Sequence, residues 1–355
     1  MKKGYLFCIA VLFLTVSVAQ ETINTMFYNL LEFPSASPGG RAVILRNILS
    51  EYEPDIFMIC ELESESGANL IQNETLNSES YQFNRAPYVA NQSGTANLQQ
   101  MLYYRSNMFT LESSSIILTT VRDINKYVLK LNTQDGDTDP VLIYVYVSHL
   151  KSSQGTANEL QRLDMVNAVT ADLETLPTDA FVLFAGDLNI YNANEPAYEE
   201  LLDETNAIVL KDPIDTPGDW HNNDTFRGIH TQSTRIDSGP FGAGAGGGLD
   251  DRFDFILISE NMLSNPKLQY VENSYKAFGN NGNCYNQSIS NATCDGAFGQ
   301  QLRNSLFSMS DHLPVVMQLQ TDREIVLGGT NFVNNNTPLK LEATLVQETV
   351  TLLSE

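Results

Sequence analysis

The stretch SMSDHLPVVMQL, residues 308–319, places two ionisable side chains directly before an apolar run. Residues 314–320 have the composition of a core strand, and Asp311 and His312 stand at its beginning. Burying ionisable side chains beside a core strand costs desolvation free energy unless these side chains are paired with other groups. A polar turn before a strand explains this stretch alone equally well, so the rest of the chain has to decide between the two readings.

Other apolar runs predict an α/β fold made mostly of strands. Two amphipathic patterns, at 39–55 and 156–176, predict helices; the second places Leu160, Leu163, Val166, Val169 and Leu173 on one face. A shorter helix is predicted in 195–204, with Pro196 near its first position and Asn194 as a candidate cap. Many strands follow one another without a helix between them, which favours two mixed β-sheets packed face to face with helices outside. The further predicted strands are 22–30, 55–62, 100–105, 115–120, 141–150, 180–188 and 253–259.

Polar side chains stand at the ends of these predicted strands. Four runs close on a polar group and two open on one. If the last two strands run antiparallel to the others, all of these groups meet at one rim of the sheets, as in a site built on rigid elements. The groups are Asn29, Glu61, His149, Asp187 with Asn189, Asp254, and Asp311 with His312.

The kinds of residue at this rim point to metal-assisted chemistry on phosphate. Carboxylate and amide oxygens suit a hard divalent cation, here Mg²⁺, with Mn²⁺ or Ca²⁺ as alternatives. The chain has 4 histidines and no Cys/His cluster with zinc spacing. It also lacks the G-x-S-x-G elbow and the G-x-x-x-x-G-K-[ST] loop. Carboxylates, amides, histidines and a divalent cation suit phosphate-ester hydrolysis.

Six short motifs, in order, carry a resemblance to a known family. FYN, PDIFMICELE, SHLKSS, GDLN, RFDFILIS and SDHLPV resemble the motif series of the endonuclease/exonuclease/phosphatase superfamily. Its members include deoxyribonucleases, abasic-site endonucleases, sphingomyelinases and inositol-phosphate 5-phosphatases. The resemblance covers roughly residues 22–320 and implies a four-layer α/β sandwich with the active site at one rim.

The resemblance assigns the metal and substrate contacts. It implies that Glu61 is a metal ligand and that Asp311 shares the same metal site. Asn29 corresponds to an asparagine that supports the site. Lys151 and Arg227 are further candidates for contacts with phosphate, although each is equally well read as a solvated surface charge.

The resemblance also assigns catalytic roles. His312 corresponds to the catalytic histidine and Asp254 to its carboxylate partner, while Asp187 and Asn189 orient the nucleophile and the phosphate. His149 corresponds to a histidine that contacts phosphate in the deoxyribonucleases. Those enzymes pair this histidine with a glutamate, where the chain instead has glutamines at 99 and 100, so we expect His149 to lack that partner. Whether Asp187 or His312 removes the water proton is left open.

The N-terminus and the cysteines indicate export. Residues 1–19 combine two lysines, an apolar stretch and small residues before Gln20, which predicts a secretory signal peptide; a membrane anchor is the alternative, but the apolar stretch is short. Export would place the mature chain outside the cell or in the periplasm. Cys284 and Cys294 flank a polar loop and are candidates for a disulfide, whereas Cys60 is expected to be a buried thiol. Residues 20–320 are the predicted catalytic domain, and 321–355 a linker with a short C-terminal appendage.

The net charge of −23 argues against a stable complex with nucleic acid, but not against a nuclease that turns over. The function expected from sequence is a secreted, monomeric, Mg²⁺-dependent phosphodiesterase, foremost a nuclease acting on extracellular DNA or RNA. One alternative is a phosphomonoesterase or phospholipase-type esterase on the same scaffold. The other is a secreted binding protein without catalysis.

Overall fold

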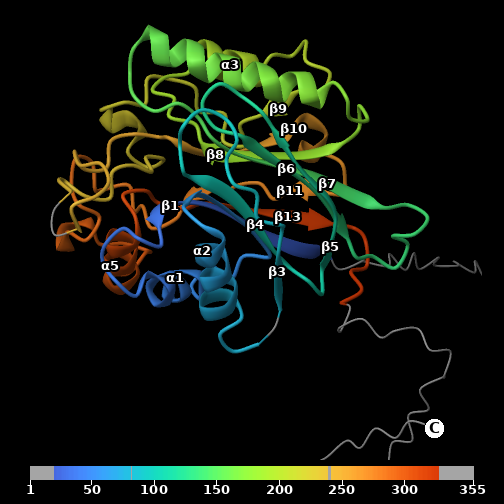
Figure 1. Cartoon of the computed structure of the whole chain (residues 1–355), viewed down its shortest axis with the longest axis horizontal. Helices are drawn as coiled ribbons and strands as arrows, with labels where there is room; N and C mark the ends of the chain where they lie inside the picture. Colours follow the sequence, from blue (N-terminus) through green and yellow to red (C-terminus); the bar gives the residue numbers. More distant parts are fainter. Residues whose placement is uncertain (1–19, 81, 239–240, 328–355) are drawn as a thin grey trace, which may run out of the picture.

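Two β-sheets face each other at the centre of the molecule (Figure 1). The computed structural model describes residues 20–80, 82–238 and 241–327. The predicted signal peptide at 1–19, and residues 328–355 of the predicted appendage, lie outside the described residues. Within the described ranges, each helix is too short or too polar to traverse a bilayer.

The first sheet has the order β11-β13-β1-β2-β4-β3, with β12 also paired to β13. β1 runs parallel to β2, and β13 runs antiparallel to β1. The sheet is therefore mixed, as predicted. Its strands are β1 (Glu21–Phe33), β2 (Ile56–Leu62), β3 (Phe83–Arg85), β4 (Gln99–Arg105), β11 (Gln269–Tyr270), β12 (Lys276–Ala277) and β13 (Val315–Thr321).

The second sheet has the order β5-β6-β7-β8-β10-β9. β7 and β8 are parallel, and β10 is antiparallel to β8, so this sheet is also mixed. The last long strand of each sheet, β10 or β13, thus runs against its neighbour, as the rim argument requires. The strands are β5 (Phe109–Ile117), β6 (Ile124–Leu131), β7 (Val141–His149), β8 (Phe181–Asp187), β9 (Leu210–Lys211) and β10 (Asp254–Ser259).

Helices cover the outer face of each sheet, which gives four layers (Figure 1). α1 (Arg41–Leu49), α2 (Glu65–Leu70), a π-helix (Ile71–Leu76) and α5 (Gln300–Met309) lie beside the first sheet; α3 (Thr156–Leu173) and α4 (Pro196–Leu201) lie over the second. Short 3₁₀ helices occur at Asp224–Phe226, Glu260–Leu263 and Ala292–Cys294. The predicted α/β sandwich, with two mixed sheets packed face to face and helices outside, is confirmed.

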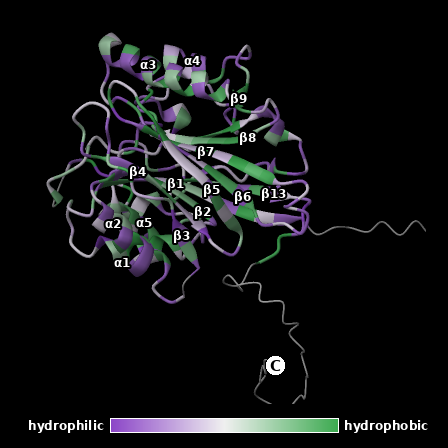
Figure 2. Ribbon diagram, turned by 45° about the vertical axis from the view of Figure 1, so that its right-hand side comes forward, coloured by the Kyte–Doolittle hydropathy of each residue, from purple (hydrophilic) through white to green (hydrophobic). Residues whose placement is uncertain are grey.

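Strand β8 shows why its sequence is almost continuously apolar. Leu183 and Ala185 belong to the large core that includes residues of both sheets, whereas Val182 and Phe184 belong to a second core with α3 and α4. All four are buried. Because both faces of the strand are covered, polar residues cannot alternate with apolar ones. In Figure 2 the strands at the centre carry mostly hydrophobic residues, while the outer helices mix hydrophilic and hydrophobic ones.

Two details of the helix predictions are wrong. The sequence places Leu160 on the buried face of α3, but it is 56% exposed, while Val166, Val169 and Leu173 are buried as predicted. Arg162 is also buried, and its guanidinium forms an ion pair with Glu195, 2.7 Å between Nη2 and Oε2. Asn194 does not cap α4; Glu195 occupies the cap position without a side-chain cap bond and instead accepts the N–H of Tyr191.

The described part of residues 203–252 is largely irregular, but backbone hydrogen bonds hold its glycine-rich segment. Gly247 and Gly248 donate N–H groups to the carbonyls of Ile236 and Arg235. Past β13 the chain stays on the body of the molecule, because Ile325 forms a bridge with Thr133. The packed domain thus continues beyond residue 320 to the end of the described segment.

A disulfide joins Cys284 and Cys294, whose Cα atoms are 5.1 Å apart, and Cys60 is a buried free thiol. We expect the double substitution Cys284→Ser/Cys294→Ser to lower the free energy of unfolding by about 2–3 kcal/mol, because the bridge closes a loop of about ten residues in the unfolded chain. Denaturant titration of the variant and the wild type measures this difference, with Cys60→Ala as a thiol control. Equal midpoints for the double variant and the wild type would contradict the prediction.

Candidate active site

The polar groups at the strand ends meet at one rim because of the strand register. Asp187 at the end of β8 pairs with Asp254 at the start of β10 on one side and with His149 at the end of β7 on the other. In the first sheet, Asn29 on β1 pairs with Cys60, the residue before Glu61 on β2. The sequence prediction of a common rim is therefore correct in its geometry.

Asn29 links the two sheets through its side-chain amide. Its Nδ2 donates to Glu61 Oε1 at 2.9 Å and to Asp187 Oδ2 at 3.0 Å, while its Oδ1 accepts the N–H of Leu31. Glu61 has a positive φ of 60°, and the β1–β2 register shifts just past Asn29. This irregularity ends the regular pairing where the carboxylate enters the site.

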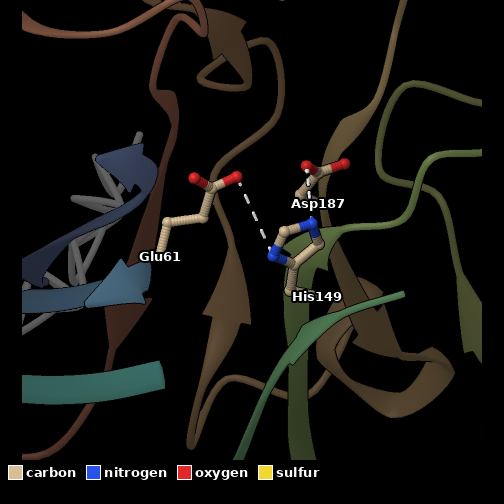
Figure 3. Close-up of side chains that lie close together, drawn as sticks. All are labelled: Glu61, His149 and Asp187. Carbon is tan, nitrogen blue, oxygen red and sulfur yellow. Dashed lines mark ion pairs between the residues drawn. The ribbon is translucent and has the colours of Figure 1, made fainter. Parts of the chain in front are cut away.

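His149 lies between two carboxylates from different strands (Figure 3). Its Nδ1 is 4.0 Å from Glu61 Oε1, and its Nε2 is 3.5 Å from Asp187 Oδ2, both longer than an ordinary hydrogen bond. Burial lowers the pKa of His149 well below its usual value, and the positive charges of Arg122 and His312 lower it further. The imidazole is therefore neutral at physiological pH.

The glutamines near β4 do not pair with His149. Gln99 lies next to the Tyr88 hydroxyl, 2.8 Å away, and Gln100 donates to the carbonyl of Asp123. The partner expected in deoxyribonucleases is thus absent from these two positions, and Glu61 and Asp187 flank the ring instead.

His312 is held by Asp254 in a buried pair. His312 Nδ1 is 2.7 Å from Asp254 Oδ2, and its Nε2 is 3.7 Å from Asp187 Oδ2. Burial alone would lower the pKa of His312, but the negative charges of Asp254, Asp187 and Asp311 outweigh burial and raise it well above its usual value. The hydrogen bond to Asp254 places a proton on Nδ1 and directs Nε2 at the rim.

Asp311 sits slightly apart from the other carboxylates. Its Oδ2 accepts the N–H of Ala245 at 2.6 Å and an N–H of the Gln232 amide at 3.3 Å. Burial raises the pKa of Glu61, and the charge of Asp311 raises it further, so the two carboxylates are within electrostatic reach of each other. Asp311 therefore stays a predicted ligand of the metal site that it would share with Glu61.

The donor set fits a divalent cation. Among the described residues, two groups of three have ligand atoms within 4.8 Å of one another: Glu61 with His149 and Asp187, and Asp187 with Asp254 and His312. Burial raises the pKa of Asp187 to about 7, and the charges of Asp254 and Glu61 add to the rise while His312 opposes it. A cation bound to Glu61 and Asp187 would relieve this repulsion, and their hard oxygens suit Mg²⁺.

We expect the stability of the metal-free protein to fall as pH rises from about 6.5 to 8. The pKa of Asp187, about 7, lies above the ordinary aspartate value, so the folded state keeps a proton that the unfolded chain has lost, and this stabilisation disappears as pH rises through 7. The raised pKa of His312 acts in the same direction. Below about pH 6.5 the lowered pKa values of His149 and His230 act in the opposite direction, which sets the lower end of the window.

Thermal unfolding midpoints in EDTA, measured across this window, test the expectation. Saturating Mg²⁺ should reduce the slope, because a bound cation favours the ionised carboxylate. Asp187→Asn should also reduce it, since the amide does not titrate. A slope that is the same in the wild type and in Asp187→Asn would show that Asp187 is not its source.

The remaining predicted site residues fall into two groups. Asn189 belongs to the site, because its N–H donates to Asp187 Oδ1 and its Nδ2 to the carbonyl of Leu150. Lys151 follows the β7 end, and its Nζ donates to the carbonyl of Ser152. Arg227 is not brought to the rim cluster; it is exposed and pairs with Asp224, the residue that opens its own 3₁₀ turn.

Two residues that contact the site had no sequence signal, and a third, Ser310, stands in the motif SDHLPV without an assigned role. Gln232 places its amide 2.6 Å from His312 Nε2. Arg122 donates to the backbone carbonyls of His149 and Leu150. Ser310 donates from its hydroxyl to the carbonyl of Asn29 and accepts the N–H of His312, which fixes the approach to β13. All three lie in irregular segments, where periodicity carries no information.

Comparison with solved structures identifies the fold. TDP2 from D. rerio, in a complex with a single-strand DNA product, superposes with a TM-score of 0.54 at 16% identity, covering 84% of this chain and 99% of that one. An endonuclease/exonuclease/phosphatase from Bacteroides vulgatus gives 0.54 at 13% identity, covering 84% and 98%. A mannosyl-6-phosphatase from Bacteroides thetaiotaomicron gives 0.51 at 13% identity, covering 84% and 99%.

No family model matches the sequence, and no curated protein matches it. The structural likeness, at low identity, therefore identifies the fold. The chain has the fold of the endonuclease/exonuclease/phosphatase family, and the resemblance seen in the sequence motifs is confirmed at that level.

Proposed function

We propose that the chain is a metal-dependent phosphoester hydrolase. The observation that carries the proposal is the buried His312–Asp254 pair, in which His312 Nε2 faces Asp187 and the carboxylates suited to a cation. This arrangement puts a histidine, a carboxylate of raised pKa and a metal-binding set at one place, as metal-assisted hydrolysis requires.

Each residue of the cluster has a defined task in this reaction. A divalent cation bound by Glu61 and Asp187 would neutralise phosphoryl oxygens and make a water molecule more acidic. Asp187 and His312 are the two groups that can accept the proton of the attacking water, and Asp254 stabilises the resulting imidazolium. The Asn29 amide and the neutral His149 ring orient Asp187 and offer hydrogen bonds to the phosphate.

The contacts made by the chain's arginines, together with its net charge, favour small phosphoesters as the substrate class. Tracking a nucleic-acid backbone needs free cations along the site. Arg162 instead pairs with Glu195, Arg227 pairs with Asp224, and Arg235 donates to the carbonyl of Phe307 and lies 4.3 Å from the centre of the Phe241 ring. Because these arginines already have partners and the net charge of the chain is −23, the binding of a long polyanion is disfavoured.

A nuclease is the second candidate. The two histidines that flank Asp187, one neutral and one of raised pKa, favour it, since a phosphodiester needs both activation of water and assistance to a poor leaving group. Lys151, half-buried beside the β7 end, is a cation near the rim that could meet a second phosphate.

A substrate panel with a metal series separates the candidates. The purified protein would be assayed with p-nitrophenyl phosphate, bis-p-nitrophenyl phosphate, sugar and inositol phosphates, sphingomyelin, plasmid DNA and RNA, each with Mg²⁺, Mn²⁺, Ca²⁺ or EDTA. Turnover of small esters, but not of DNA or RNA, supports the first candidate, and the reverse supports the nuclease. Absence of turnover on every substrate, together with no uptake of Mg²⁺ or Mn²⁺, would support a binding protein without catalysis.

We further propose that the protein acts as a monomer outside the cytoplasm, secreted or in the periplasm. The Cys284–Cys294 disulfide supports an oxidising compartment. Fractionation of the producing cells and light scattering of the purified protein test these two points.

A further inference from the structure

The Gln232 side chain lies directly on the catalytic histidine. Its Nε2 is 2.6 Å from His312 Nε2 and 3.3 Å from Asp311 Oδ2. Asp254 Oδ2 accepts the hydrogen bond of His312 Nδ1, so the other ring nitrogen, Nε2, is the one that faces the Gln232 amide. The second N–H of the same amide then points at a carboxylate, so both amide protons are used within the site.

The backbone around Gln232 fixes the direction of this side chain. The Gln232 N–H donates to the Asp251 carbonyl at 3.0 Å, and the Gln232 carbonyl accepts the N–H groups of Asp250 and Asp251. On the other side, Gln232 forms a bridge with His312, and Leu313 donates to the carbonyl of Thr231 at 2.7 Å. The residue is thus held between the segments that lead into β10 and β13.

The amide occupies the position that a reacting group needs. In the proposed hydrolysis, His312 Nε2 has to face the water or the phosphate, yet the Gln232 amide lies against this nitrogen. Asn29 Nδ2, 3.4 Å from the same Nε2, and Asp187 Oδ2, 3.7 Å from it, border the same position. A phosphoryl oxygen that arrives there comes within reach of the Gln232 amide.

We propose that Gln232 is a phosphate-binding residue, which rests on His312 Nε2 when no phosphate is present and donates its amide N–H to a non-bridging phosphoryl oxygen when a phosphoester is bound. This inference rests on the proposed phosphoester hydrolysis. A small rotation of the amide exchanges a nitrogen acceptor for a charged oxygen, to which hydrogen bonds are stronger. The same movement frees Nε2 for the reaction.

Inorganic phosphate is the probe that tests this assignment without depending on turnover. Calorimetric titration of the Mg²⁺-loaded protein with phosphate would compare the wild type with Gln232→Ala and with Gln232→Glu. We expect a loss of affinity of about tenfold for the alanine variant, which lacks a hydrogen bond to a charged group. The glutamate variant, of nearly the same shape, should lose more, because its carboxylate repels phosphate.

Kinetics and a control complete the test. With whichever panel substrate is hydrolysed, Gln232→Ala should lower kcat/KM by about tenfold to a hundredfold. Gln287→Ala is the matched control, because Gln287 is exposed and its side chain bonds to Asn291. Gln287→Ala should leave both readouts unchanged.

Two results would overturn the assignment. Unchanged phosphate affinity in Gln232→Ala and Gln232→Glu would show that the amide does not bind phosphate. Tighter binding of phosphate by Gln232→Ala would show that the side chain only blocks the site. If the wild type hydrolyses no substrate, the proposed function fails, while the phosphate titration still decides the role of Gln232. If the alanine variant does not fold, the near-isosteric Gln232→Glu decides it.

Discussion

His312→Ala lowers kcat by roughly two to four orders of magnitude, the range expected for loss of a positioned acid–base group. The ring is buried, and Asp254 holds its Nδ1 at 2.7 Å, so the substitution removes the imidazole that this carboxylate positions. Glu61 and Asp187 remain, and metal binding should therefore persist. Initial rates at saturating substrate and Mg²⁺, with metal uptake measured in parallel, check both statements.

Asp254 should behave as one unit with His312. Asp254→Asn is expected to lose activity in the same direction, because an amide cannot stabilise a charged imidazolium. The double variant should lose little more than His312→Ala alone. His221→Ala is a matched control, since His221 Nδ1 also lies 2.7 Å from a carboxylate, that of Asp251, but His221 is half-exposed and outside the metal-ligand groups. Fully additive losses would contradict the pairing, and near-wild-type activity in His312→Ala would remove the mechanism.

Asp187→Asn is expected to lower kcat/KM by roughly three orders of magnitude, within the range for acid–base groups. The carboxylate lies between two imidazoles, 3.5 Å from His149 Nε2 and 3.7 Å from His312 Nε2, and it accepts from Asn29. The substitution keeps the shape but removes both the negative charge and the capacity to accept a proton. It should therefore weaken metal binding as well as the chemical step.

The pH–rate profile and a control variant distinguish these effects. If Asp187 is the base, the loss measured at saturating metal stays large, and the acidic limb of kcat/KM changes shape in the variant. If the loss disappears at high Mg²⁺ or Mn²⁺, Asp187 serves only as a ligand. Asp55→Asn is the matched control: Asp55 is buried and paired with Arg105, and it precedes β2, about 20 Å along the strand from Glu61. Asp55→Asn should leave the rate within a few fold of the wild type.

The rim could be predicted because strand ends are visible in sequence. In a run such as FVLFAGD, the side chains on both faces of the strand pack into the core and are therefore apolar. The first carboxylate after them marks the end of the strand. Two strands that begin on carboxylates then had to run against the others, and the Asp187–Asp254 register shows that they do. The residues that share one metal could not be predicted in the same way, since side-chain reach decides whether Asp187 or Asp311 lies next to Glu61.

Other features gave too weak a sequence pattern to be predicted. Lysines at 126 and 130 interrupt the apolar alternation of β6, and they are accommodated by ion pairs with Asp172 and Glu112. α5 is absent from the sequence prediction although Leu302, Leu306 and Met309 recur at helical spacing and are buried. The buried Arg303 also anchors this helix by donating to the carbonyl of Ile289. Contacts such as this one and the lysine ion pairs join separate segments, so local periodicity does not reveal them.

The pairing of β13 with β1 has a consequence for when the protein becomes active. Glu21 pairs with Thr321, so β1, the first strand, has β13, the last strand of the described residues, as its hydrogen-bonded neighbour. A nascent chain that has emerged only as far as β10 carries Asn29, Glu61, His149 and Asp187, but neither His312 nor the strand that places it. Folding of the complete domain requires the contact between β1 and β13, which joins residues some three hundred positions apart in the sequence. Contacts between residues so far apart in sequence form slowly. We therefore expect fragments that end before β13 to lack a complete site, and the proposed hydrolysis to require a chain that includes β13.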